Sequence, residues 1–186
     1  MIELKLLDEE YPFSGFTHTR IVARGIVLNE HGLVALHHIV RNDIFGKQQY
    51  FETPGGGVDE GEMIEEALKR ECSEELGEDV EIIRKLGVVE DAYNLIHRRN
   101  VNHYYLCRKL NQSQTHFVSE GDALIQETLW LDLNKAIEAM ESQEDEGVAL
   151  LVKRRELPIL KEAKRILEEG KPKMALSDKV NATESH

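Results

Sequence analysis

The stretch that decides the fold is residues 55–78, which read GGGVDEGEMIEEALKRECSEELGE. Its glycines, glutamates and arginine stand at fixed intervals: a glycine, five residues, a glutamate, seven residues, an arginine and a glutamate, two residues, two glutamates, one residue and a glycine. These positions are Gly56, Glu62, Arg70, Glu71, Glu74, Glu75 and Gly77. Because each residue type is used at roughly 5–7%, such a set arises by chance about once in 10⁹ start points. The intervals therefore indicate a specific structure.

Glutamates gathered near the end of this stretch indicate a cation site. The spacing predicts a helix over residues 62–76, which places Glu71, Glu74 and Glu75 at i, i+3 and i+4 on one face. They lie at the C-terminal end, where the helix dipole repels anions, and Gly77 is a suitable residue to end the helix. Like charges at this spacing destabilise a helix by roughly 0.2–0.5 kcal/mol per pair. A divalent cation such as Mg²⁺, which prefers oxygen ligands, would offset that cost.

The alternative interpretation of this acidic run is a solvated helix face, which is the usual meaning of charged residues in series. The flanking glycines and the arginine favour the cation site, because a solvated face requires neither. The apolar residues of the earlier turns share the angular sector of Glu71 and Glu75. We therefore expect a helix whose first turns enter a core and whose last turns line a cavity.

The intervals match the Nudix box, G-x5-E-x7-R-E-U-x-E-E-x-G-U, where U is a bulky aliphatic residue, and the chain resembles the Nudix hydrolases. Two aliphatic positions of the box are occupied differently here. Cys72 takes one of them, a mild change because a free cysteine packs as a small hydrophobe. Glu78 takes the last one, and we expect the burial that is lost there to pass to Val80.

The resemblance implies an α/β/α sandwich, an α/β fold in which a mixed sheet surrounds a central catalytic helix. The pattern of apolar and β-branched residues agrees with it. It predicts strands over residues 17–28, 33–40, 50–53, 80–89, 101–110 and 128–131, and a polar loop over 41–49.

Helical spacing predicts extra C-terminal helices at about 133–169, with one helix over 133–141 and another over 148–169. Pro158 should break or kink the second of these helices. We expect one Nudix hydrolase domain over residues 1–170, with its box at 56–78. A flexible tail would follow over residues 171–186.

The resemblance also implies a metal cofactor, Mg²⁺ or Mn²⁺, and its ligands. They would be the carbonyl of Gly55 and the carboxylates of Glu71, Glu74, Glu75 and Glu120. Glu120 lies in the loop before the strand at 128–131, where similar enzymes have a mobile glutamate, and an ordinary turn acid is the alternative. Glu75 or Glu120 would accept the proton of an attacking water.

Other residues of the box are expected to hold this site in place. Arg70 would orient the catalytic glutamates by charge-assisted hydrogen bonds rather than contact the substrate. Glu62 would connect the glycine loop to the start of the helix. Gly56 and Gly77 are expected to be structural.

Two residues outside the box are candidates for substrate binding. Arg41 lies fourteen residues before Gly55. A related enzyme of the MutT-like branch has an arginine there that contacts the nucleotide, and an exposed loop charge is the alternative. Glu52 directly precedes the Thr53-Pro54-Gly55 segment, and it would face either the substrate or the edge of a strand.

The activity implied is metal-dependent hydrolysis of a pyrophosphate linkage in a nucleoside diphosphate derivative. Nucleoside triphosphates are favoured as substrates. The ADP-sugar and NADH branches carry proline motifs downstream of the box, whereas no proline occurs between Pro54 and Pro158. Tyr93 lies near a tyrosine of dinucleoside polyphosphate hydrolases, at a loose offset. Dinucleoside polyphosphates and ADP-sugars therefore remain alternative substrates.

Two function classes other than hydrolysis are also open. One is a non-catalytic Nudix-fold ligand sensor, although the charged positions of the box are complete. The other is an enzyme similar to isopentenyl-diphosphate isomerase, which uses a catalytic cysteine. Cys72 and Cys107 match its motif poorly, and burial as structural residues is the expectation for both.

Composition limits the partners. The net charge of −12 argues against a nucleic-acid-coating surface, which would be basic, and it would repel a phosphorylated substrate unless a metal and local basic residues bridge it. No apolar run approaches the roughly 18 residues of a membrane span. Two cysteines and an N-terminus without signal-peptide features predict a cytoplasmic protein. A small nucleotide as its partner is what the resemblance to the Nudix hydrolases implies.

Two further patterns concern packing. His37 and His38 should point to opposite faces of a strand, so they cannot bind one ion together. The segment over 148–167 carries an apolar face formed by Val148, Leu151, Val152, Ile159, Leu160, Ala163 and Leu167. This face should cover the sandwich or meet a second subunit in a homodimer.

Overall fold

The computed structural model describes residues 1–110 and 123–171. In chain order its elements are β1 (Ile2–Lys5), β2 (His18–Leu28), β3 (Val34–Asp43), β4 (Gly46–Glu52), β5 (Gly55–Gly57), α1 (Ile64–Leu76), β6 (Val80–Tyr93), η1 (Asn94–Ile96), β7 (Arg98–Lys109), β8 (Ile125–Leu131), α2 (Leu133–Glu141) and α3 (Gly147–Glu169). The expected α/β sandwich with a mixed sheet and C-terminal helices is confirmed. The limits of the domain stay a prediction, and the tail over 172–186 lies outside the described residues.

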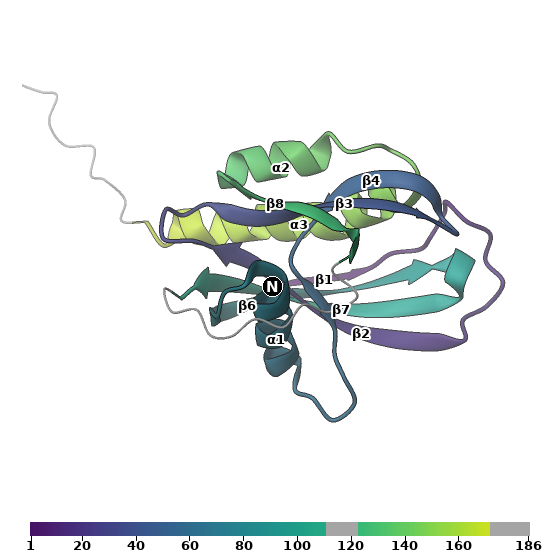
Figure 1. Ribbon diagram of the computed structural model, residues 1–186, viewed down its shortest axis with the longest axis horizontal. Helices are drawn as coiled ribbons and strands as arrows, with labels where there is room; N and C mark the ends of the chain where they lie inside the picture. The colour runs from purple at the N-terminus through teal and green to yellow at the C-terminus, as the bar shows by residue number, and fades with distance from the viewer. Residues whose placement is uncertain (111–122, 172–186) are drawn as a thin grey trace, which may run out of the picture.

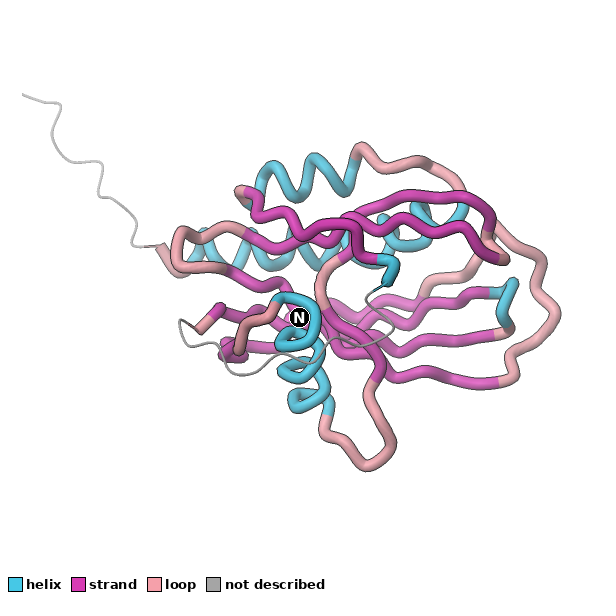
Figure 2. The backbone as a smooth tube through the Cα atoms, viewed as in Figure 1, coloured by secondary structure: helices cyan, strands magenta, loops and turns pink. Residues whose placement is uncertain are grey.

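The strands form a mixed sheet that opens in the middle. The order is β1-β6-β7-β2-β3-β4, with β5 paired to β2 and β8 paired to β3. The β1–β6 and β2–β7 pairs are parallel and the other pairs are antiparallel. Strands β2 and β3 share a single registered pair, Leu28 with Val34, so two groups of strands diverge from this point (Figures 1 and 2).

Two apolar clusters lie on opposite faces of the sheet, because successive strand residues point to opposite sides. Ile26 and Leu28 of β2 join the cluster that packs against α2 and α3, whereas Ala23 and Val27 join the cluster that packs against α1. Figure 1 shows α1 apart from α2 and α3, with the strands between them. This arrangement leaves the polar residues of β2, β3 and β7 to line the opening between the two groups of strands.

Several predicted boundaries were wrong. The polar loop over 41–49 is instead a β-hairpin, in which Arg41 pairs with Gln48 and Gly46 adopts a positive φ of 83° at the turn. The sequence concealed it because polar residues occupy both faces. Strand β1 was not predicted, β6 and β7 extend further than expected, and β8 begins at Ile125.

The helix of the Nudix box, α1, also begins later than predicted. Met63 is its N-cap, so Glu62 precedes the helix instead of lying in its first turn. The reason is that a carboxylate oxygen of Glu62 accepts a hydrogen bond from the amide of Asp59, which holds Glu62 in the loop. At the other end, Gly77 has the left-handed conformation (φ 68°) that the helix stop required. Val80 is buried in place of Glu78, as expected.

Of the break or kink predicted at Pro158, the break does not occur, because α3 continues through this residue. A proline inside a helix costs about 3 kcal/mol. Residues on both sides of it are fully buried, among them Val152, Glu156, Ile159 and Leu160. Tertiary packing therefore outweighs the local penalty. The apolar face of α3 covers the sandwich, which was the first of its two expected outcomes.

Candidate active site

The end of α1 meets the glycine loop through a fixed carboxylate. The amide of Gly55 donates to Oε2 of Glu75 at 2.8 Å, and Nε2 of His37 lies 3.0 Å from the same oxygen. Nδ1 of His37 is 2.9 Å from Oγ1 of Thr128, which orients the imidazole ring. Three elements, β3, β5 and β8, therefore hold one glutamate of α1.

Gly56 leaves room for a second carboxylate. A Cβ atom at this position would lie 2.5–2.6 Å from the carboxyl atoms of Glu71, closer than real Cβ contacts. Burial raises the pKa of Glu71, and the negative charges of Glu75 and Glu74 raise it further. The guanidinium of Arg70 lowers this pKa but does not cancel the rise. The negative charge of Glu71 is therefore only partly compensated by its surroundings.

Arg70 connects the box glutamates to the loop. Its guanidinium donates two hydrogen bonds to the carboxylate of Glu62, at 2.9 and 3.0 Å. It also donates to Oε1 of Glu71 at 2.9 Å, to Oε2 of Glu74 at 3.5 Å and to the carbonyl of Gly57 at 3.0 Å. These bonds are the geometry that an orienting arginine requires, since planar guanidinium groups match carboxylates in pairs.

The fit to a divalent cation is partial. Glu71 and Glu75 line the pocket described below, whereas Glu74 is turned toward Arg70 and does not. Among residues 1–110 and 123–171, no three His, Cys, Asp or Glu side chains converge as a ready metal site. The negative charge gathered around Glu71, which its surroundings compensate only in part, fits a cation at these two glutamates. Glu120 lies outside the described residues.

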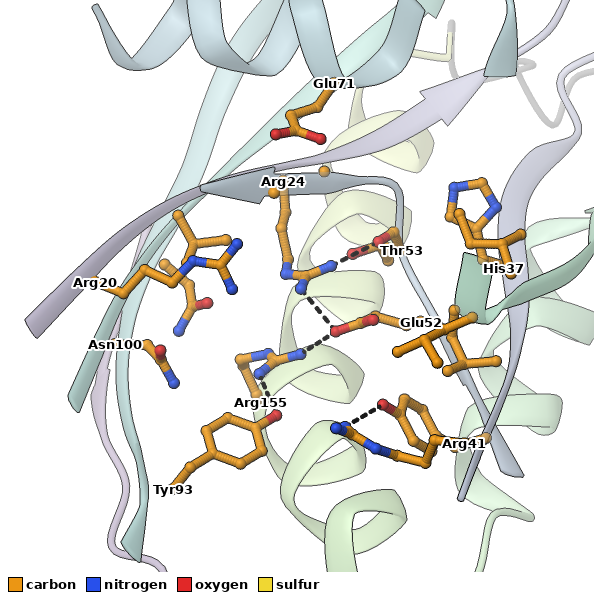
Figure 3. Close-up of a pocket in the computed structure, with 18 of the residues that line it drawn as sticks. Arg20, Arg24, His37, Arg41, Glu52, Thr53, Glu71, Tyr93, Asn100 and Arg155 are labelled. Carbon is orange, nitrogen blue, oxygen red and sulfur yellow. Dashed lines mark hydrogen bonds and ion pairs between the residues drawn. The ribbon is translucent and has the colours of Figure 1, made fainter. Parts of the chain in front are cut away.

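A pocket of about 350 Å³ opens beneath α1, between the two groups of strands (Figure 3). Its polar lining includes the arginines Arg20, Arg24, Arg41, Arg98 and Arg155 and the glutamates Glu52, Glu71 and Glu75. Figure 3 shows Glu71 at one end of this space and Tyr93 and Arg41 at the other. The positive lining provides the local basic residues that a chain of net charge −12 needs to admit a phosphorylated ligand.

A buried ion network forms the base of the pocket. The carboxylate of Glu52 lies 2.7 Å from a guanidinium nitrogen of Arg24 and 2.8 Å from one of Arg155. Burial acts to raise the pKa of Glu52, but the two arginines hold it below its ordinary value. Glu156, beside them on α3, accepts hydrogen bonds from the amide and hydroxyl of Thr53 at 2.8 and 2.9 Å. Helix α3 thereby anchors the chain directly before the glycine loop.

The two predicted substrate residues both line the pocket. The carboxylate of Glu52 is paired with Arg24 and Arg155. It is therefore not an unpaired acid at the edge of a strand. Arg41 is bound to Asp43 at 2.6 Å and to the hydroxyl of Tyr50 at 3.2 Å, and it lies 4.6 Å from the ring centre of Phe45. Their roles in binding substrate stay predictions.

Sequence reasoning missed several residues of this site. It separated His37 from His38 correctly, but gave no sign that His37 contacts Glu75 across 38 positions of sequence. It also missed Arg155 and the pocket arginine Arg20. One signal was present: Arg155 lies three residues after Val152 and four before Ile159, so it shares the apolar face of its helix. A charged residue on the apolar face of a helix indicates a buried ion pair, because a buried charge needs a partner.

Both cysteines are structural in their surroundings, as expected. Cys72 and Cys107 are fully buried in the cluster between α1 and the sheet, and neither lines the pocket. Burial raises the pKa of the Cys72 thiol well above its ordinary range and that of Cys107 to about 12. Neither thiol is suited to act on a ligand in the pocket.

The sequence profile of the NUDIX domain matches residues 18–155, which is most of the chain. The chain belongs to the NUDIX domain family. The resemblance drawn from residues 55–78 is thus confirmed. Within the described ranges of this NUDIX protein, no helix is both long and apolar enough to span a membrane.

Individual relatives support the same assignment. A segment of 56 residues is 48% identical to the 8-oxo-dGTP diphosphatase of Haemophilus influenzae and covers 30% of this chain and 40% of that protein. The match thus spans less than half the length of that relative. A NUDIX hydrolase from Nitrosomonas europaea has the same fold, with a TM-score of 0.60, 12% identity, and coverage of 78% of this chain and 88% of that one. The MutT protein of Methanosarcina mazei Go1 also has this fold, with a TM-score of 0.56 and 19% identity. The match covers 82% of this chain and 96% of that one.

Proposed function

We propose that this NUDIX protein is a metal-dependent hydrolase that cleaves a pyrophosphate linkage in a nucleoside diphosphate derivative, with nucleoside triphosphates as the favoured substrates. One observation carries the proposal: the glutamates of the box, Glu71 and Glu75, line one end of a pocket whose other polar walls are rich in arginine. Negative groups that bind a cation and positive groups that bind phosphate oxygens are thus adjacent. This is the charge pattern that phosphoryl chemistry needs.

The metal ligands we propose are Glu71, Glu75 and the carbonyl of Gly55, with Glu74 and Glu120 completing the set. Bound Mg²⁺ would neutralise charge on the diphosphate and lower the pKa of the attacking water. Arg70 keeps Glu71 and Glu74 oriented through the hydrogen bonds described above.

Glu75 is our candidate for the group that accepts the proton from the attacking water, with Glu120 as the alternative. Its carboxylate is held by the Gly55 amide and by His37, so its position is fixed without a ligand. A fixed base loses little orientational freedom when the reaction occurs. The hydrogen bonds to one oxygen leave the other available to the water.

The proposed substrate class rests on the one reported relative whose name states its substrate. The protein from Haemophilus influenzae is an 8-oxo-dGTP diphosphatase, and the matching segment is nearly half identical. Dinucleoside polyphosphates and ADP-sugars remain alternatives. A non-catalytic ligand sensor would have no need of an intact carboxylate set. The buried thiols of Cys72 and Cys107 disfavour an isomerase that uses a cysteine.

A substrate panel separates these alternatives. Deoxynucleoside triphosphates including 8-oxo-dGTP, a dinucleoside tetraphosphate, ADP-ribose and isopentenyl diphosphate would be incubated with the protein and Mg²⁺. We expect the highest kcat/KM for a nucleoside triphosphate. If the dinucleoside tetraphosphate or ADP-ribose is cleaved faster, that compound is the preferred substrate and the assignment to nucleoside triphosphates is wrong. Isomerisation of isopentenyl diphosphate without hydrolysis of any compound would overturn the proposal.

Divalent metal should stabilise the folded protein, because it binds carboxylates that are assembled only in the fold. At about 100 times its Kd, Mg²⁺ or Mn²⁺ should add roughly 2.7 kcal/mol to the free energy of unfolding, a rise of roughly 5–10 °C in Tm. Differential scanning fluorimetry with each ion and with EDTA measures this. A Tm that responds to neither ion would count against an assembled metal site.

The Gly56→Ala variant should lose activity while keeping its fold. The new methyl group would occupy the space of the Glu71 carboxylate, which has to move. A displacement of about 1 Å at a catalytic group can reduce turnover on the order of a hundredfold. Steady-state kinetics and a thermal melt of the same preparation check it. Unchanged kcat would show that the position of Glu71 is unimportant.

A further inference from the structure

Two of the pocket arginines differ from the rest. Arg24, Arg41 and Arg155 each form an ion pair with a carboxylate at 2.6–2.8 Å. Arg20 and Arg98 also line the pocket, but no ion pair or hydrogen bond joins either side chain to another described residue. The buried Nε of Arg98 has no hydrogen-bond partner there, and its guanidinium only faces the ring of Tyr93, 5.3 Å from the ring centre.

The sheet brings these two arginines together. In the parallel pairing of β2 with β7, His18 is opposite Arg98 and Arg20 is opposite Asn100. Alternate residues of a strand share a face, so Arg20, Arg98 and Asn100 all point into the pocket. Figure 3 shows the side chain of Arg20 beside Asn100, on the wall to one side of Arg24.

This wall adjoins the candidate catalytic glutamates. Strand β5 pairs with β2, and Gly57 is opposite Val22. A Cβ atom on Gly57 would lie 2.9 Å from the guanidinium of Arg20, as one on Gly56 would meet the carboxylate of Glu71. Successive strand residues point to opposite faces, so the two side chains lie on either side of neighbouring residues of the glycine loop. Both side chains line the same pocket, so a ligand held at Glu71 can extend past the edge of this loop to Arg20.

Two unpaired cations that lie side by side repel each other. Burial lowers the pKa of both arginines, and a neighbouring arginine lowers each further: Arg24 in the case of Arg20, and Arg20 in the case of Arg98. The remaining charges at the base of the pocket are paired with one another. An incoming dianion would remove the repulsion and use guanidinium donors that no described group occupies.

We propose that Arg20 and Arg98 form a phosphate subsite for a group that lies beyond the diphosphate engaged by the α1 glutamates. Resting on the proposed function, this subsite makes a nucleoside triphosphate, rather than a nucleoside diphosphate or a diphosphate sugar, the substrate class of the protein. The third phosphate supplies the negative charge that the two arginines lack. A diphosphate substrate would leave them uncompensated.

The first test measures binding without metal or catalysis. Inorganic tripolyphosphate would be titrated into wild-type protein in EDTA by isothermal titration calorimetry, and into the variants Arg20→Gln and Arg98→Gln. Each variant should bind at least about tenfold more weakly, equivalent to ~1.4 kcal/mol. Arg99→Gln is the matched control, because Arg99 is the next residue of β7, is exposed, and lies 3.8 Å from Glu90 on the surface. It removes the same charge and should bind within about twofold of wild type.

The second test asks whether the arginines act on the substrate. The ratio of kcat/KM for dGTP to that for dGDP should fall at least about tenfold in Arg20→Gln and Arg98→Gln, and should be unchanged in Arg99→Gln. The Tm of the pocket variants should be equal to or higher than that of wild type, because the repulsion between two unpaired cations is removed. A structural role would instead lower Tm and leave the ratio unchanged, and that result would overturn the proposal.

These outcomes separate the subsite from the proposed function. Tripolyphosphate binding that is absent in wild type, or equal in wild type and both pocket variants, would overturn the subsite even if dGTP is hydrolysed. Binding that depends on Arg20 and Arg98 in a protein that hydrolyses no nucleotide would support the subsite and contradict the hydrolase.

Discussion

Replacing Glu75 by glutamine should reduce kcat at least about tenfold, because loss of a charged group at a metal-binding catalytic site costs more than ~1.4 kcal/mol of transition-state stabilisation. Glutamine keeps the shape of the side chain and removes its charge. The hydrogen bonds from Gly55 and His37 have an acceptor in the variant as well, so the fold should be retained. Glu74→Gln should show a loss of at least the same order.

The matched control is Glu66→Gln. Glu66 lies on the same helix but is exposed and does not line the pocket. Its activity should stay within about twofold of wild type, since surface substitutions rarely exceed ±0.5 kcal/mol. Steady-state kinetics with Mg²⁺ distinguish the variants. The rise of Tm on adding Mg²⁺ should be smaller in Glu75→Gln than in wild type and unchanged in Glu66→Gln. Activity within twofold of wild type in both Glu74→Gln and Glu75→Gln would refute the assignment of the site.

Truncating the chain after Glu146, which removes α3, should abolish cooperative folding. The helix buries a set of aliphatic side chains that are at most 5% exposed: Val148, Leu151, Val152, Ile159 and Leu160. At roughly 1.5–3 kcal/mol each, their burial is comparable to the whole stability of about 5–15 kcal/mol of a typical domain. The truncation would also remove Arg155 and Glu156, so Glu52 would lose one of its two arginines, and the amide and hydroxyl of Thr53 would lose their acceptor.

A truncation after Lys171 is the control for this experiment. It keeps all of α3, and the residues that it removes contain little apolar material. Its Tm and kcat should equal those of the full chain. Size-exclusion chromatography and thermal melts compare the three proteins. If the chain ending at Glu146 is monodisperse, melts cooperatively and keeps its activity, α3 is an appendage and the pocket does not need it.

The parts of the fold that were predictable depend on short stretches of sequence. The box helix, its stop at Gly77 and the burial of Val80 follow from residues that lie within a few turns of one another. The apolar face of α3 was visible for the same reason, because a helical period repeats locally. Polar residues on both faces hid the hairpin around Gly46, since alternation is the only local signal of a strand.

The pocket was less predictable because its residues come from distant segments. Arg20 and Arg98 become neighbours only through the parallel β2–β7 pair, and such a pairing has no local signature. Glu52 and Arg155 meet across 103 positions. This pairing places Glu52 in an ion network at the base of the pocket, and its role in binding substrate stays a prediction. The structure thus adds an arginine-lined wall to the glutamates that the box predicted.

The central claim is that this site hydrolyses a pyrophosphate linkage with the box carboxylates. The most direct measurement is ³¹P NMR of dGTP incubated with the wild-type protein and Mg²⁺, with Glu75→Gln and an EDTA sample beside it. The account predicts that wild type converts dGTP to dGMP and pyrophosphate, and that both comparison samples do so at least about tenfold more slowly. Unchanged dGTP in the wild-type sample, or equal conversion in all three, would contradict it.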